Sequence, residues 1–334
     1  MVSAVIFVAT SCVSPLTGFA FWETNLAYEG ESIYNYLQVK NLSDRTILST
    51  NVLFGVQSVT MKDKGLTGMY YDTALAAPAL ADNANSALIL GMGTGTYARQ
   101  LKQYYPKMNI TGVKIDQKIT DLAGEYFDEP ADIPVTTYDG RAWLAASHDK
   151  YDVIMVDAYQ DITIPFQMSS TEFFTMVREH LNPGGVMVVN MNMISDGQGS
   201  INEALSDTIA SVFGNGNTLT ADVPNTTNRE LFAKKPGSGS EENSMQQASK
   251  ALNLRETTYE RTGSEDLEWY MEEVASRFRK VNEPDSASTI LTDDKAPVEV
   301  LGMHAIDQII ADEAGPYRQI LKDEGFGGLL RAVQ

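Results

Sequence analysis

The chain has 334 residues, 43% of them hydrophobic, which is enough for one large domain or two smaller ones with a substantial core. Its 44 acidic and 25 basic residues give a net charge of −19. Such a surface repels phosphate backbones, which argues against a nucleic-acid partner, and it attracts cations, although solubility is the simpler explanation. The single cysteine, Cys12, excludes an internal disulfide and a cysteine-rich zinc site. The three scattered histidines indicate neither a metal centre nor a Ser-His-Asp triad.

Residues 1–22 carry no charged side chain and are about as long as a thin membrane crossing requires, although Pro15 and Gly18 interrupt the run. They lack the basic segment that begins a signal peptide. Three interpretations stay open: a single membrane anchor, the remnant of a longer membrane domain, or an apolar lead-in packed on the globule. As an anchor, the segment would place the acidic body in the cytoplasm, at the inner face of the cell membrane.

Residues 23–80 are expected to form a small N-terminal domain. The stretch 28–60 is rich in β-branched and aromatic residues and is divided by turn-forming residues, as in a sheet of antiparallel hairpins. Residues 66–81 then predict a linking helix, with Pro78 near its end. The turn-forming residues are Asn41, Ser43, Asp44, Asn51 and Gly55.

From residue 81 onward, apolar runs alternate with helical segments. The apolar runs predict five strands, at 86–91, 109–116, 133–140, 151–159 and 184–192. Helices are expected at 95–105, from 117 to about 127, from 141, and at 171–181. This alternation is typical of an open, doubly wound and mostly parallel sheet, so we expect an α/β, Rossmann-like domain over 81–334.

The C-terminal part of that domain has a less regular pattern. The polar, Gly- and Ser-rich stretch 235–247 predicts a surface loop, and helix-like stretches follow at 248–256 and 265–281. Residues 289–302, with the sequence TILTDDKAPVEVLG, predict a structured strap.

A glycine turn follows the first of the five strands. Gly91, Gly93 and Gly95 stand at alternate positions in ALILGMGTGTYARQL, so the backbone there has no Cβ to keep a ligand away. The spacing is GxGxG, whereas dinucleotide-binding turns have GxGxxG. The turn therefore suits an adenosyl group with a short amino-acid or amine tail better than a pyrophosphate. Such turns occur in many α/β proteins, so this signal alone is weak.

Three aspartates end the strands that follow the glycine turn. Asp116 ends VKID and could accept hydrogen bonds from both ribose hydroxyls, and Asp139 ends TTYD and could accept from an adenine amino group. Asp157 ends VIMVD and would face the reacting atom. Each could instead be a solvated loop residue or a helix N-cap, Asp139 in particular. Together, and in register with the glycine turn, the three carboxylates predict a nucleoside site.

Many segments of the chain resemble the spermidine synthases, or polyamine aminopropyltransferases. The likeness is greatest to bacterial spermidine synthase-like proteins that follow a multi-spanning membrane domain. It covers roughly residues 28–195, and weakly the strap LTDDKAPVE. The segments that carry it include SIYNYLQV, LFGVQSV, YYDTALAAP, ILGMGTGT, VKID, YDGRAWL, YDVIMVDAY, IPFQMSSTEFF and LNPGGVMVVN. The resemblance implies a β-hairpin domain on a Rossmann-like domain of the methyltransferase type.

The resemblance also implies a reaction. The co-substrate is decarboxylated S-adenosylmethionine, and a small cationic amine attacks the aminopropyl carbon next to the sulfonium. Methylthioadenosine leaves, and no metal is needed because the cationic sulfur is already a good leaving group. Members of the family often dimerise, so a homodimer is expected.

The resemblance assigns roles to single residues. Asp157 matches the catalytic aspartate, which accepts the proton of the amine or orients it. Asp161 matches the acidic residue that holds the far end of a diamine. Gln57 and Tyr71 are expected near the substrates, and Tyr159 either lines the acceptor pocket or packs within its loop. The residues expected to bind the donor are Asn35, Gly91, Gly93, Thr94, Gly95, Asp116, Asp139 and Gly140.

Four features depart from the family pattern. Thr94 replaces the aspartate that grips the donor's ammonium, and a hydroxyl offers about 1 kcal/mol where a charge-assisted bond offers about 1.5–3 kcal/mol. Lys114 replaces the glutamate that binds the ribose, so Asp116 would have to take that role. The family's Tyr-His-Glu segment reads Tyr71-Asp72-Thr73, in which Asp72 restores one acidic group. The loop AYQDITIPFQMSS also differs, which predicts an unusual acceptor pocket.

Three functions stay open at this point. The first is an aminopropyltransferase that makes spermidine or a related polyamine. The second is a methyltransferase that uses intact S-adenosylmethionine, because Thr94 removes the main feature that selects the decarboxylated donor. The third is a non-catalytic nucleoside-binding module, with which Lys114 and the altered segment 71–73 would agree.

Overall fold

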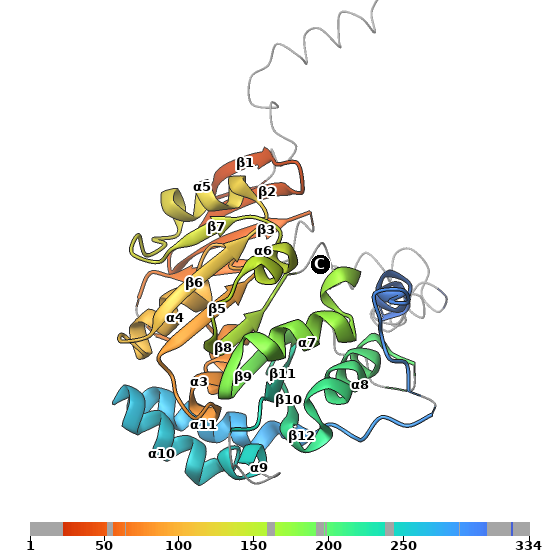
Figure 1. Ribbon diagram of the computed structural model, residues 1–334. Helices are drawn as coiled ribbons and strands as arrows, with labels where there is room; N and C mark the ends of the chain where they lie inside the picture. The colour runs from red at the N-terminus through yellow and green to blue at the C-terminus, as the bar shows by residue number, and fades with distance from the viewer. Residues whose placement is uncertain are drawn as a thin grey trace, which may run out of the picture.

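The computed structural model describes residues 23–51, 56–63, 65–158, 164–191, 197, 199–237, 244–286, 288–305 and 322. These residues form a four-stranded and an eight-stranded sheet with helices around them (Figure 1). The apolar segment 1–22 lies outside the described residues. Within the described ranges, no helix combines the length and the apolar character that a membrane crossing needs.

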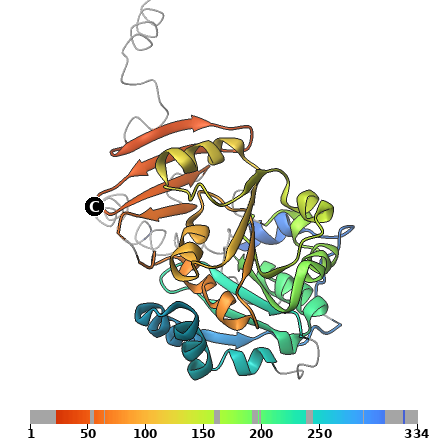
Figure 2. The ribbon, with the colours of Figure 1, turned by 60° about the vertical axis from the view of Figure 1, so that its left-hand side comes forward.

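The N-terminal sheet is made of antiparallel hairpins, as expected. Its strands are β1 (Leu26–Glu31), β2 (Tyr36–Asn41), β3 (Arg45–Thr50) and β4 (Ser58–Met61), in the order β1-β2-β3-β4. Three buried side chains of this sheet, Leu37, Val39 and Leu48, pack against the second domain. They contact Leu122 of helix α5 (Gln117–Tyr126) and Phe127, the residue after that helix. The small sheet is thereby docked on the second domain, as Figure 2 shows.

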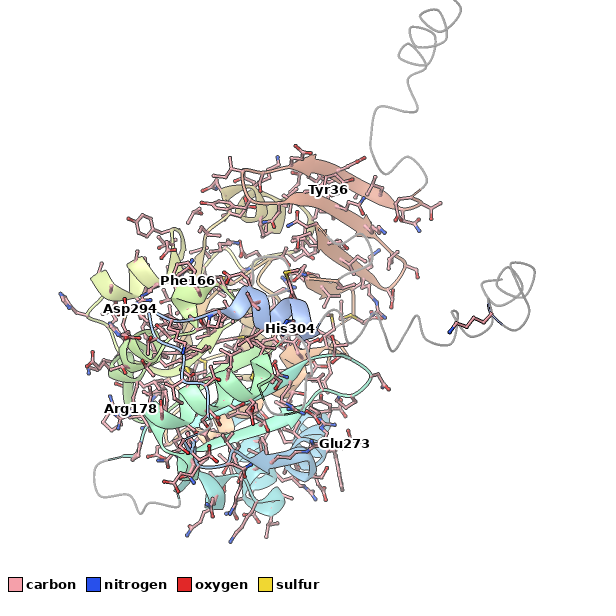
Figure 3. The ribbon with its side chains drawn as sticks, turned by 90° about the vertical axis from the view of Figure 1, so that its right-hand side faces the viewer. Tyr36, Phe166, Arg178, Glu273, Asp294 and His304 are labelled. Carbon is pink, nitrogen blue, oxygen red and sulfur yellow. The ribbon has the colours of Figure 1, made fainter. Side chains whose placement is uncertain are left out.

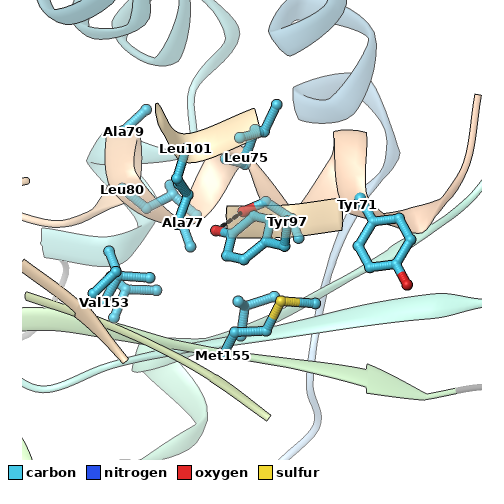
Figure 4. Close-up of a cluster of buried hydrophobic side chains, with 14 of the residues drawn as sticks. Tyr71, Leu75, Ala77, Ala79, Leu80, Tyr97, Leu101, Val153 and Met155 are labelled. Atoms are coloured by element: carbon cyan, nitrogen blue, oxygen red, sulfur yellow. Dashed lines mark hydrogen bonds between the residues drawn. The ribbon is translucent and has the colours of Figure 1, made fainter. Parts of the chain in front are cut away.

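The linking segment forms two short helices, α2 (Tyr70–Ala74) and α3 (Ala76–Leu80), instead of the single helix expected over 66–81. Pro78 has no N–H with which to bond the carbonyl of Ala74, four residues earlier, and its ring crowds that carbonyl. The hydroxyl of Tyr97 donates to this carbonyl at 3.0 Å from the buried side of α4 (Thr96–Tyr104) (Figure 4). The break therefore costs no unsatisfied backbone acceptor.

The large sheet confirms the five parallel strands. They are β5 (Ser86–Leu90), β6 (Asn109–Lys114), β7 (Val135–Thr137), β8 (Tyr151–Val156) and β9 (Leu181–Met191). The strand order is β12-β10-β11-β9-β8-β5-β6-β7. β6 and β7 follow on one side of β5, and β8 and β9 follow on the other side, so the strand order switches at β5. The carboxyl ends of the parallel strands meet at one edge, which is where open α/β sheets bind ligands.

Alternate residues of the central strands pack against two helical layers. Ile89 and Met155 belong to a core shared with α2, α3, α4 and α11 (Glu265–Arg277). Leu88 and Ile154 belong to a second core with α6 (Gly140–Ala146), α7 (Thr171–His180) and α8 (Ile201–Phe213). Figure 1 shows α6, α7 and α8 on one side of the sheet and α3 and α4 on the other. The doubly wound α/β architecture is thus confirmed.

Three antiparallel strands were not expected from the sequence. They are β10 (Thr218–Asp222), β11 (Arg229–Lys234) and β12 (Phe278–Lys280), which extend the sheet beyond β9. The segment RELFAK is buried throughout, and its three charged residues, Arg229, Glu230 and Lys234, mask its strand character. The expected surface loop 235–247 also overlaps a short helix, α9 (Ser244–Ala248), which α10 (Ala251–Thr262) and α11 follow.

Candidate active site

A cavity of about 630 Å³ opens at the carboxyl edge of the parallel strands. Its walls come from the N-terminal sheet, the glycine turn, the tips of β6, β7 and β8, and the loop between β10 and β11. The predicted site residues that line it are Asn35, Gln57, Tyr71, Gly91, Gly93, Asp116, Asp139, Gly140 and Asp157. The three strand-tip aspartates therefore share one hollow, as the sequence predicted.

Asp157 follows β8 directly and is held at both carboxylate oxygens. The hydroxyl of Tyr70 donates to Oδ2 at 2.6 Å, and the amide of Asn190, in β9, donates to Oδ1 at 2.9 Å. Removal from water raises the pKa of Asp157 to about 7, and the two hydrogen bonds limit that rise. A carboxyl group with a pKa near 7 exchanges a proton readily at neutral pH, which suits an acid–base role.

The tyrosine that contacts Asp157 is Tyr70, whereas the resemblance pointed to its neighbour. Tyr71 lines the cavity, but its hydroxyl donates to the carbonyl of Gln57 at 2.8 Å. Successive helical residues point about 100° apart, so a shift of one residue exchanges the two roles. The geometry favours aligning Tyr70, and with it Tyr71-Asp72, with the family's Tyr-His-Glu segment.

Asp72 lies away from the cavity and stabilises the local fold. It is buried, and its carboxylate accepts hydrogen bonds from the backbone N–H groups of Thr67 and Gly68 at 2.9 and 2.7 Å. The side chain of Gln100, in α4, also donates to it. These bonds occupy the carboxylate, so the structure does not bring Asp72 together with the expected substrate-binding residues.

Asp116 and Asp139 each begin a helix as well as line the cavity. Asp116 Oδ1 caps α5 by accepting from the N–H of Lys118 at 2.9 Å, and Oδ2 accepts from Ser32 at 2.6 Å and Asn35 at 3.2 Å. Asp139 Oδ1 caps α6 by accepting from the N–H of Ala142 at 2.7 Å. The two readings of Asp139, N-cap and cavity residue, thus hold together.

The glycine turn approaches the ligand edge through its backbone. Gly91, Gly93 and Gly95 all have positive φ angles, of 89°, 53° and 84°. Gly91 and Gly93 line the cavity, whereas Gly95 is the N-cap of α4. Thr94 is fully buried and does not line the cavity, so its hydroxyl does not stand where the family's aspartate was expected to act.

Lys114 brings a cation into the cavity wall. Its ammonium pairs with Glu129 at 2.7 Å and donates to the carbonyl of Gly93 at 3.2 Å. Both side chains are largely buried, and burial lowers the pKa of Lys114 while Glu129 opposes that shift. The carboxylate of Glu129 therefore lies beside the glycine turn, although no sequence pattern pointed to this residue.

Asn190 and the loop 225–228 were also missed by sequence reasoning. Asn228 donates to Asn190 Oδ1 at 2.9 Å, which orients the amide that holds Asp157. The loop residues Asn225, Thr226, Thr227 and Asn228 line the same side of the cavity. They follow β10, which was itself not recognised.

Tyr159 and Asp161 lie outside the described residues. Within the described part of the chain, no group of three or more His, Cys, Asp or Glu could hold a metal ion, and a metal-free site remains a prediction.

Tyr70→Phe is expected to shift the acid limb of the profile of kcat/KM against pH to higher pH. The phenol stabilises the charged form of Asp157, so its loss raises a pKa that is already about 7. Loss of one hydrogen bond to a charged group corresponds to roughly one pH unit in kcat/KM. Tyr97→Phe is the control, because that hydroxyl bonds a core carbonyl. If the acid limb of the kcat/KM profile has the same midpoint pH in Tyr70→Phe and in wild type, the Tyr70 hydroxyl does not stabilise the charged form of Asp157.

Glu230→Gln is expected to stabilise the fold at alkaline pH. Glu230 is fully buried in β11, and neither carboxyl oxygen has a hydrogen-bond partner among the described residues. Burial and the nearby Asp157 raise its pKa well above 4.5, so the folded protein keeps a proton that the unfolded chain releases. The contribution of Glu230 to wild-type stability therefore falls as pH rises above about 4.5.

Denaturant unfolding at pH 5 and pH 8 tests this. The variant should exceed wild type by on the order of 1–3 kcal/mol at pH 8, and by less at pH 5. The same pH dependence in both proteins would show that Glu230 is solvated or paired.

A Rossmann-like domain with a glycine turn after its first strand and acidic tips on the following strands is typical of proteins with the methyltransferase fold. The chain belongs to the spermine/spermidine synthase family, because residues 69–235 match the spermine/spermidine synthase domain. It is similar to a "probable polyamine aminopropyl transferase" of Bifidobacterium longum (strain NCC 2705), with 99% identity over 334 residues. That match covers the whole of this chain and 75% of the relative.

More distant relatives agree with this assignment. A polyamine aminopropyltransferase of Vibrio vulnificus is 27% identical over 209 residues, which are 60% of this chain and 69% of that protein. The crystal structure of a probable spermidine synthase from Corynebacterium glutamicum superposes with a TM-score of 0.55 at 20% identity. It covers 80% of this chain and 99% of that chain, a likeness that supports the fold.

Proposed function

We propose that the chain is a polyamine aminopropyltransferase, which transfers an aminopropyl group from decarboxylated S-adenosylmethionine to a diamine and releases methylthioadenosine. The observation that carries the proposal is the carboxyl group of Asp157, held by Tyr70 and Asn190 within the cavity of about 630 Å³. The names of the relatives in Bifidobacterium longum and Vibrio vulnificus support the same activity.

Asp157 would act on the attacking amine. Its carboxylate takes a proton from the ammonium of the diamine, which frees the nitrogen lone pair. That nitrogen forms a bond to the aminopropyl carbon, and the carbon–sulfur bond breaks. The electron pair of the broken bond goes to the sulfonium, so methylthioadenosine leaves as a neutral thioether. The cavity contributes alignment of donor and acceptor, which converts a bimolecular encounter into a positioned one.

The charge of the cavity supports a cationic donor and a cationic acceptor. The described lining includes three carboxylates, Asp116, Asp139 and Asp157, and one ammonium, Lys114, which is itself paired. Decarboxylated S-adenosylmethionine carries a sulfonium and an ammonium without a carboxylate, so this wall attracts it more than the zwitterionic tail of the intact form. The neutral amides and hydroxyls of 225–228 would line the acceptor end.

Lys114 also supports a second candidate, a methyltransferase that uses intact S-adenosylmethionine. Its ammonium lies against Gly93 in the cavity wall, where it could attract the carboxylate of a full methionine tail. In that case the sulfonium would transfer a methyl group, and Asp157 would still accept a proton from the nucleophile.

Calorimetric titration with the two forms of the donor separates these candidates. Decarboxylated S-adenosylmethionine should bind more tightly than the intact form, and incubation with putrescine or another diamine should yield methylthioadenosine and a longer polyamine. Preference for the intact form with methyl transfer would replace the first candidate by the second. Binding of neither form would favour a non-catalytic member of the family.

The expected homodimer and the membrane attachment form a separate part of the proposal. An anchor at residues 1–22 would hold the acidic body on the cytoplasmic side, where the nucleoside donor is made. Fractionation of cells that express the chain with and without residues 1–22 tests the attachment, and light scattering of the purified chain tests the dimer. If both chains partition equally between membrane and soluble fractions, the membrane attachment is refuted. If light scattering shows a monomer, the homodimer is refuted. Neither result bears on the proposed activity.

A further inference from the structure

The strap near the C-terminus is fastened to the parallel-sheet domain beside the cavity. Leu291 is fully buried in the core of α7 and α8, and its N–H donates to the hydroxyl of Thr208 at 2.9 Å. Its carbonyl accepts from the N–H of Thr171, at the start of α7, also at 2.9 Å. Two residues later the strap presents Asp293; Figure 3 labels the adjacent Asp294, and also Phe166.

Asp293 connects two segments that are distant in sequence. Arg141, in α6, donates from Nη1 to Oδ1 at 2.7 Å and from Nη2 to Oδ2 at 2.6 Å. The hydroxyl of Ser170, the N-cap of α7, donates to Oδ1 at 2.5 Å. Arg141 Nη1 also donates to the carbonyl of Gln167 at 2.7 Å. Two parallel charged bonds fix direction as well as distance, so the strap sets how α6 and 167–170 face each other.

The neighbours of these residues line the cavity. Asp139 and Gly140 lie immediately before Arg141, and Gln167 and Met168 lie in the short 3-10 helix η2 (Phe166–Met168). The two segments lie close together, as a distance of 3.6 Å from the position of a Cβ on Gly140 to Met168 Cε indicates. A change in their spacing therefore changes the width of the cavity at the side of Asp139.

We infer that Asp293 is a positioning residue of the donor site, which fixes the gap between the start of α6 and η2 through Arg141 and Ser170. The inference rests on the proposed function, because it takes the ligand of that gap to be the adenosyl group of the donor. Asp293 does not line the cavity itself, so its effect on binding is transmitted through the residues it holds.

An ion pair at the surface contributes little to stability, so stability and binding can be separated. The side chains of Arg141 and Asp293 are 20% and 40% exposed. Arg255 and Glu268 form a comparable pair at 2.7 Å, with exposures of 25% and 19%, between α10 and α11. Neither of these two residues lines the cavity, so Glu268→Gln is a matched control for Asp293→Asn.

Calorimetry with methylthioadenosine, the product of the proposed reaction, tests the inference. Asp293→Asn should raise its Kd about 5- to 10-fold and raise the donor KM similarly, with kcat changed less than about twofold. Glu268→Gln should bind as wild type does, while thermal unfolding shows a comparable small loss of stability in both. Arg141→Lys, which keeps the charge but loses the paired geometry, should resemble Asp293→Asn.

The outcomes distinguish the inference from the function on which it rests. If wild type binds methylthioadenosine and Asp293→Asn binds it equally well, the inference is overturned and the proposed function stands. Equal weakening by Asp293→Asn and Glu268→Gln would also overturn it, because the effect would then be one of general stability. If wild type does not bind methylthioadenosine, both fall.

Discussion

Asp157→Asn is expected to lower kcat by roughly 10²–10⁴-fold and to leave the Kd for methylthioadenosine nearly unchanged. The amide has the same shape and can still contact Tyr70 and Asn190, so the cavity keeps its form. It cannot take a proton from the attacking ammonium, so the nitrogen lone pair stays occupied. Steady-state kinetics with a diamine and calorimetry with the nucleoside measure the two quantities.

Asp152→Asn provides a control on the same strand. Asp152 is buried at the start of β8, and its two oxygens accept from the N–H of Asn85 and from the side chain of Asn182, both at 2.8 Å. It resembles Asp157 in strand, burial and hydrogen bonding, but it lies at the opposite end of β8 from the cavity. Asp152→Asn should therefore cost stability without a large change in kcat. Comparable kinetic losses in both variants, or normal turnover by Asp157→Asn, would refute the role assigned to Asp157.

The parallel-sheet domain could be predicted because its signals are local. A run such as YDVIMV is apolar throughout, as a strand buried on both faces must be, and its tip places Asp157 by simple topology. The same rule placed Asp116 and Asp139 at the same edge. β11 could not be found in this way, because Glu230 and Lys234 are buried in it and give a polar sequence.

The details of the site required the structure for a different reason. One sequence cannot separate Tyr70 from Tyr71, because either can be aligned with the family tyrosine and only the helix phase decides which reaches Asp157. The buried orientation of Thr94 likewise follows from the left-handed backbone of its glycine neighbours. Contacts between distant segments, such as Arg141 with Asp293, leave no signal in local periodicity.

Gly91→Ala is expected to destabilise the fold by roughly 3 kcal/mol or more and to abolish nucleoside binding. A methyl group at this position would lie 2.3 Å from the backbone oxygen of Asp157 and 2.7 Å from the nitrogen of Ala158. Both neighbours are backbone atoms of the chain that continues β8, so neither can rotate away. The positive φ of 89° adds the strain of a left-handed conformation.

The consequence reaches Asp157 directly. Asp157 is bonded through its N–H to the carbonyl of Leu90 at 2.8 Å, so the tips of β5 and β8 touch where the methyl group would enter. The glycine thus lets the turn come close to the nucleoside and lets β8 bring Asp157 beside it. Gly124→Ala is the control, since it lies in α5 with nothing within 4 Å of its Cβ position and should stabilise by about 0.5–1 kcal/mol. Denaturant unfolding and methylthioadenosine calorimetry on both variants test this. A folded Gly91→Ala protein that binds the nucleoside as wild type does would show that β5 and β8 can separate without loss of the site.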